Sequence, residues 1–244
     1  MKIQYFKEYS FHLDRDMEYK IYGHAGKVCF VFPCQSGRFY EWEDRGMFEA
    51  VQDLIDAGKV QFCTVDSVDD ESWTSSQDVS SRMAIQEKYV QYIVDELVPD
   101  VAHVTHQAKD TKYMVTGASL GATHAAICFL RFPAVFDTIL GMSGVYDVHD
   151  YFAGYKDLNT TRNNPIEYLE NMDDSSLELV RSNKMIFAVG QGAWEDHCKK
   201  TLDDFSEVLK KNGVKAWVDY WGYDVDHDWH WWKKMFDYFM HTLV

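Results

Sequence analysis

Ser119 has the clearest chemical potential of any side chain in this sequence. It lies in the segment Gly117-Ala118-Ser119-Leu120-Gly121, between an apolar run and a run of small residues. In a G-x-S-x-G pattern, a sharp turn from a strand into a helix lifts the serine hydroxyl above the end of a sheet, and the glycines avoid steric clashes. We therefore expect Ser119 to be a nucleophile.

A serine hydroxyl needs a histidine to take its proton and a carboxylate to orient that histidine. With this pattern the expected chain order is serine, acid, histidine. His227 and His230 lie in the loop GYDVDHDWHWW, and His241 falls in the expected terminal helix. We expect His227 to be the base, because a loop can reach over the strand ends. His230 would then cap or pack the helix that follows.

The acid should come from the preceding loop, GQGAWED, which ends in Glu195 and Asp196 just before a helix. The spacing to that helix favours Asp196, with Glu195 as the alternative. Whichever is not the acid would cap the helix N-terminus, an interaction worth roughly 0.5–2 kcal/mol.

Attack on a carbonyl also needs N–H donors for the oxyanion. Leu120, directly after the nucleophile, should supply one of them. The second should come from the loop after an early strand, where the sequence reads Cys34-Gln35-Ser36-Gly37. We expect the backbone N–H of Gln35 to serve, with Cys34 as the alternative.

The surrounding pattern shows which elements would position these residues. Short apolar runs of strand length alternate with segments of helical period, and residues up to about Gly23 suggest a strand pair at a sheet edge. The runs are 27–33, 60–66, 112–118, 136–144, 184–190 and 215–221. Helices are expected over 82–98 (stopping before Pro99), 121–132, 196–211 and 231–243. This alternation predicts an α/β fold with a mostly parallel sheet, helices on both faces and sites at the carboxyl ends of the strands.

Segment 145–182 breaks the alternation with an aromatic, polar and irregular sequence. We expect a single domain over 1–244 in which this segment is an excursion over the active site. Tyr40, Trp42 and Trp73 are candidates for the wall of the substrate pocket, with core packing as the alternative.

Composition narrows the function classes. The formal net charge of the 244 residues is −15. The negative electrostatic field of such a chain repels nucleic acid and anionic membrane surfaces. Five cysteines without a C-x-x-C pair favour reduced thiols. With no signal-peptide pattern and no stretch of the ~18 apolar residues that span a bilayer, we expect a cytoplasmic location. Whether copies form a homo-oligomer is left open.

Two other classes compete with a serine hydrolase. His103-x-x-His106 and the cluster at 224–230 offer metal-ligand types, but neither matches H-E-x-x-H or a structural zinc spacing. We expect no metal or other cofactor. A non-catalytic binding protein on the same fold is the second alternative, since fold alone does not establish function.

At these motifs the chain resembles the "putative esterase" (esterase D-like) family of the α/β-hydrolase superfamily. The resemblance is carried by GASLGA (117–122), SVDDESW (67–73), DELVPDV (95–101) and HDWHWW (227–232). GQGAWED and NNPIEYL resemble a bacterial cytoplasmic subgroup of uncharacterised esterases. The family groups S-formylglutathione hydrolases, feruloyl and acetyl xylan esterases, enterobactin-type esterases and mycolyltransferases.

This resemblance implies the α/β-hydrolase fold and a metal-independent enzyme that cleaves small-molecule carboxylic esters. The implied roles fall on Ser119, on Asp196 or Glu195, and on His227. An acyltransferase would use the same residues and stays an alternative. The early loop departs from the family, because it reads FPCQSGRF (32–39) where a His-Gly type sequence is usual.

Overall fold

The computed structural model describes residues 1–244 and contains one eight-stranded sheet in the order β1-β2-β4-β3-β5-β6-β7-β8. The first two strands form an antiparallel hairpin that pairs antiparallel with β4, and all remaining pairs are parallel. The strands are β1 (Ile3–Ser10), β2 (Arg15–Tyr22), β3 (Lys27–Phe32), β4 (Val60–Val65), β5 (Tyr113–Ala118), β6 (Phe136–Met142), β7 (Lys184–Val189) and β8 (Trp217–Tyr220). The predicted α/β class is confirmed, and the strand boundaries agree within two residues.

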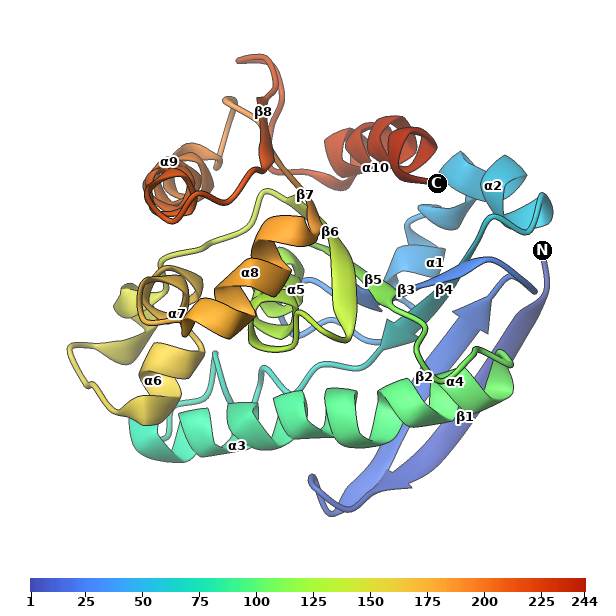
Figure 1. The fold of residues 1–244 in the computed structure, drawn as a ribbon, viewed down its shortest axis with the longest axis horizontal. Helices are drawn as coiled ribbons and strands as arrows, with labels where there is room; N and C mark the ends of the chain where they lie inside the picture. Colours follow the sequence, from blue (N-terminus) through green and yellow to red (C-terminus); the bar gives the residue numbers. More distant parts are fainter.

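Helices cover both faces of this sheet (Figure 1). Alternate side chains of a strand enter different cores: Phe30 and Phe32 of β3 join a cluster of 44 buried residues, whereas Cys29 and Val31 join a second cluster of 23. This alternation follows from the two-residue period of a strand. The face of the smaller cluster carries α1 (Glu41–Asp44), η1 (Phe48–Val51), α2 (Gln52–Asp56) and α10 (Trp229–Leu243). The other face carries α3 (Val79–Gln91), α4 (Val98–Val104), α5 (Leu120–Arg131) and α9 (Asp196–Lys211).

The helix expected over 82–98 does not stop at Pro99. After α3 the chain makes a π-helical turn, η2 (Tyr92–Leu97), and continues as α4 with Pro99 in its first turn. A proline is tolerated there because its missing N–H lies where helical N–H groups lack partners, and the π turn absorbs the change in hydrogen bonding. The prediction of a stop was therefore wrong.

The irregular segment 145–182 folds into short helices. They are η3 (His149–Phe152), α6 (Leu158–Arg162), α7 (Pro165–Glu170) and α8 (Asp174–Ser182). Side chains of Asp157, Asn164 and Asp173 cap the last three of them. Because α6 packs against α3 and α7 packs against α5 and α9, the segment is anchored to three helices. In Figure 1, α6 and α7 lie at the end of the molecule away from the β1–β2 hairpin. Its role as a cover over a substrate stays a prediction.

None of the helices is both long enough and apolar enough to cross a lipid bilayer.

Candidate active site

Ser119 occupies a tight turn between β5 and α5. Its backbone has φ 55° and ψ −130°, a left-handed conformation that is strained for a residue with a Cβ. The flanking glycines are needed because their neighbours leave no room for a side chain. A Cβ on Gly117 would lie 2.2 Å from the carbonyl carbon of Gly121, and a Cβ on Gly121 would lie 2.4 Å from the carbonyl oxygen of Pro33. The turn thus has the geometry expected from the motif.

His227 lies over this turn, with its Nε2 3.0 Å from the Ser119 Oγ. The loop that carries it is tied to the loop before α9 by several hydrogen bonds, two of which lie next to the histidine. The His227 N–H donates to the carbonyl of Ala193, and the Ala193 N–H donates to the Asp226 carboxylate. The His227 side chain is 20% exposed, so its ring is held in place yet remains open to solvent. His230, by contrast, is exposed in the first turn of α10.

Glu195, rather than Asp196, contacts the histidine. Its Oε2 lies 3.2 Å from the His227 Nδ1, and its side chain is fully buried. Asp196 is the first residue of α9, is exposed and forms no hydrogen bond to His227. Trp194 has a left-handed backbone with φ 67°, and this turn directs the next residue beneath the histidine. The preference for Asp196 is therefore corrected to the alternative, Glu195.

Ser143 is a site residue that the sequence did not reveal. It follows β6, is completely buried, and its hydroxyl donates to the Glu195 Oε1 at 2.5 Å. The Ser143 oxygen in turn accepts a hydrogen bond from the Trp232 Nε1 at 3.0 Å, and the Trp232 ring packs edge-on to His227 with centroids 4.8 Å apart. One sequence signal for Ser143 is its position directly after β6, the strand that pairs with β5. Many residues have a comparable position, so this signal is not specific.

We expect Ser143→Ala to weaken both stability and turnover. The change leaves the Glu195 Oε1 and the Trp232 N–H buried without their partner, and each such group typically costs about 1–3 kcal/mol. A less firmly held carboxylate should lower kcat by about tenfold, the equivalent of one lost hydrogen bond. Urea unfolding and steady-state kinetics measure the two effects. Unchanged stability would contradict the hydrogen-bond chain.

The early loop, residues 33–37, is here named the oxyanion loop because it adjoins the turn at Ser119. The Cys34 N–H donates to the Glu41 Oε2 at 2.8 Å, and the Ser36 N–H donates to the Asp69 Oδ2 at 2.8 Å. The Gly37 N–H is also paired, with the carbonyl of Cys34. This leaves the Gln35 N–H without a protein partner. The geometry therefore favours Gln35 over the alternative, Cys34.

The Leu120 N–H is the second available donor. Leu120 is the first residue of α5, where N–H groups have no intrahelical acceptor and the helix dipole favours negative charge.

Three metal-ligand types meet at the site, because the ligand atoms of Glu195, Cys198 and His227 lie within 4.8 Å of one another. The set is poorly suited to a cation. Burial, assisted by the Glu195 charge, raises the pKa of the Cys198 thiol to about 12, so a cation would have to displace the thiol proton to bind there. The other two groups are already hydrogen-bonded to each other.

A family model described as "Putative esterase" matches residues 10–241. The chain belongs to this esterase family. It is therefore an ester hydrolase by family, with the fold of the α/β hydrolases. No curated protein sequence matches the esterase significantly.

Solved structures share the fold of the esterase at low sequence identity. A ferulic acid esterase has a TM-score of 0.78 at 16% identity, over 97% of this chain and 95% of the other. S-formylglutathione hydrolase from Agrobacterium tumefaciens has a TM-score of 0.77 at 12% identity, over 98% and 93%. A fluorophosphonate-binding serine hydrolase from Staphylococcus aureus has a TM-score of 0.72 at 14% identity, over 99% and 97%.

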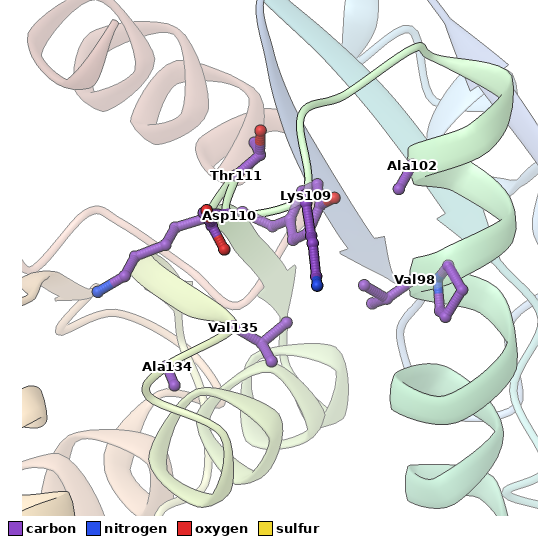
Figure 2. Close-up of a pocket in the computed structure, with 10 residues that line it drawn as sticks. Val98, Ala102, Lys109, Asp110, Thr111, Ala134 and Val135 are labelled. Atoms are coloured by element: carbon purple, nitrogen blue, oxygen red, sulfur yellow. The ribbon is translucent and has the colours of Figure 1, made fainter.

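Two hollows of the esterase differ in their relation to Ser119. The larger, about 510 Å³, includes Tyr113 at the start of β5, whereas Ser119 follows the other end of that strand. Figure 2 shows Val98 and Ala102 of α4 facing Val135 across it. A hollow of about 430 Å³ adjoins the oxyanion loop instead, and is lined by Arg38, Tyr40, Glu41, Asp44 and Arg45.

The three aromatic residues suggested for a pocket wall lie in different environments. Tyr40 lines the hollow beside the oxyanion loop and is 40% exposed. Trp42 and Trp73 are buried in the two cores, so neither side chain lines a pocket wall.

Proposed function

We propose that the esterase hydrolyses carboxylic esters through an acyl-enzyme on Ser119, with His227 as the base and Glu195 as the residue that orients it. One observation carries this proposal. Ser119, His227 and Glu195 form a continuous hydrogen-bonded chain, with contacts of 3.0 and 3.2 Å, at the carboxyl ends of β5 and β7. A hydroxyl, an imidazole and a buried carboxylate in this order are the requirements for nucleophilic acyl transfer.

The proposed reaction has two halves. In the first, the His227 Nε2 takes the hydroxyl proton as the Ser119 Oγ attacks the ester carbonyl. The oxyanion is stabilised by the N–H groups of Leu120 and Gln35, and the alcohol leaves with the proton from His227. In the second, His227 removes a proton from water as the water oxygen attacks the acyl carbonyl, and it then gives that proton to the Ser119 Oγ as the bond between serine and the acid breaks. Glu195 accepts the Nδ1–H throughout and stabilises the imidazolium.

Hydrolysis of p-nitrophenyl acetate and butyrate, beside labelling by a fluorophosphonate, tests this proposal. We expect turnover, a single covalent label and a labelled peptide that contains Ser119. An added alcohol acceptor would distinguish hydrolysis from acyl transfer by its ester product. A folded sample with neither turnover nor label would support the non-catalytic alternative.

We expect the activity to survive removal of divalent cations, since each proposed step uses groups of the protein alone. After dialysis against EDTA, kcat/KM for p-nitrophenyl acetate should stay within about twofold of the untreated value, less than 0.5 kcal/mol. The control is a sample dialysed without chelator. A loss that added Zn²⁺ or Mg²⁺ reverses would point to a metal enzyme.

A further inference from the structure

We propose that a buried hydrogen-bond relay fixes the oxyanion loop and makes Asp69 and His124 positioning residues for the reaction. The relay consists of Trp73, Gln86, His124 and Asp69, and it ends on the backbone N–H of Ser36. The proposal rests on the proposed function, because it assigns the relay a role in placing the Gln35 N–H.

The relay lies in an environment where polar groups need partners. The side chain of Asp69 is fully buried and that of His124 is 2% exposed. The His124 ring is surrounded by the aromatic rings of Phe32, Trp73 and Tyr89, with centroids 5.5–6.0 Å away. A carboxylate enclosed in this way is stable only when paired and hydrogen-bonded, so the contacts of Asp69 are obligatory rather than incidental.

The hydrogen bond between Trp73 and Gln86 determines which group donates and which accepts in each of the other hydrogen bonds of the relay. The indole Nε1 of Trp73 can only donate, and it donates to the Gln86 Oε1 at 3.0 Å. The Gln86 amide nitrogen therefore faces the His124 Nδ1, 3.4 Å away, which must accept. The ring proton of neutral His124 then lies on Nε2 and is donated to the Asp69 Oδ1 at 2.9 Å.

The other Asp69 oxygen accepts the Ser36 N–H. The Gln35 N–H thus lies between two N–H groups that are each held by a carboxylate, Cys34 by Glu41 and Ser36 by Asp69. Ser36 has a left-handed backbone with φ 56°, a conformation that persists only where its surroundings hold it. Asp69 holds the Gln35–Ser36 peptide through the Ser36 N–H. Without it, the preceding Cys34–Gln35 peptide, which carries the Gln35 N–H, would be held only from the Cys34 side of the loop, by Glu41 and by the Gly37 N–H.

The decisive variant is Asp69→Asn, which keeps the size but offers one acceptor and one donor. If its oxygen accepts from Ser36, its amide group faces the Nε2–H of His124, donor against donor. We expect kcat for p-nitrophenyl acetate to fall about 10- to 100-fold, since a misplacement near 1 Å can cost about 10²-fold. KM should change less than about twofold, because the oxyanion forms only after binding.

The double variant Asp69→Asn/Gln86→Glu should restore the relay in the reverse direction. The new glutamate can accept from both Trp73 and the His124 Nδ1–H, and the new asparagine can then donate to the His124 Nε2 while it accepts from Ser36. The buried charge is the same as in the native protein. We expect kcat to return to within about threefold of its original value, under 0.7 kcal/mol.

Glu87→Gln is the matched control. Glu87 is a buried carboxylate beside Gln86 on α3, but it pairs with Arg131 and Asn163 rather than with the oxyanion loop. This variant should lower Tm and leave kcat unchanged. Equal kcat losses in Glu87→Gln and Asp69→Asn would show a general structural effect and overturn the proposal.

Nitrogen-15 NMR of the unaltered protein gives a test that no folding defect can obscure. The imidazole shifts should show neutral His124 with its proton on Nε2, and the Nδ1–H tautomer would overturn the relay. Native kcat in a folded Asp69→Asn protein, or a folded double variant without recovery, would overturn the positioning role. If the native protein neither turns over esters nor takes the label at Ser119, the proposed function fails instead, while the tautomer still reports on the relay.

Discussion

Replacing Ser119 with alanine should lower kcat for p-nitrophenyl acetate by about 10⁴–10⁶-fold. The change removes the oxygen that we propose forms the acyl-enzyme, while the Leu120 and Gln35 N–H groups stay in place. The remaining rate would come from direct attack of water on the ester carbonyl, with the oxyanion still stabilised by these two N–H groups. Steady-state kinetics and mass spectrometry after fluorophosphonate treatment measure the loss of turnover and of the label.

Ser182→Ala is a suitable control, because Ser182 ends α8 and its hydroxyl donates only to the nearby carbonyl of Leu179. Its turnover and labelling should equal those of the native chain. A Ser119→Ala protein that keeps even a hundredth of the native kcat, with label at another residue, would contradict the assignment of the nucleophile.

The second large effect is expected for Glu195→Gln, with kcat lower by about 10⁴-fold. The hydrogen bonds around Ser143 give the reason. Trp232 donates to the Ser143 oxygen, so the Ser143 hydroxyl donates to Oε1, and the amide group of a glutamine would have to face the His227 Nδ1. The imidazole proton would then move to Nε2, where it faces Ser119 and prevents His227 from acting as a base.

Asp196→Asn provides the matched comparison at the adjacent position. Asp196 is exposed at the start of α9, so its loss should affect helix stability by less than about 1 kcal/mol and leave kcat unchanged. Steady-state kinetics of both variants decide between the two carboxylates. A large loss in Asp196→Asn with an active Glu195→Gln would reverse the correction made from the structure.

Most strands of this fold and the turn at Ser119 could be predicted because each is determined by a short stretch of consecutive residues. Each strand from β3 onward coincides with a short apolar run, and two glycines around Ser119 permit the tight turn within five consecutive residues. The choice of His227 depended only on chain order and on its place in a loop. The end of the helix before Pro99 was misplaced because a π turn, which has no simple sequence signature, lets the helix continue.

The finer choices at the site depend on contacts between distant segments. Glu195 and Asp196 are chemically similar neighbours, and only the backbone turn at Trp194 determines which of them lies under the histidine. Cys34 and Gln35 differ as N–H donors only because a carboxylate seven residues away occupies the first. Ser143 meets Glu195 across 52 residues of chain. Hydrogen bonds of this kind are set by how the loops at the strand ends pack together, and no single segment of the sequence contains that information.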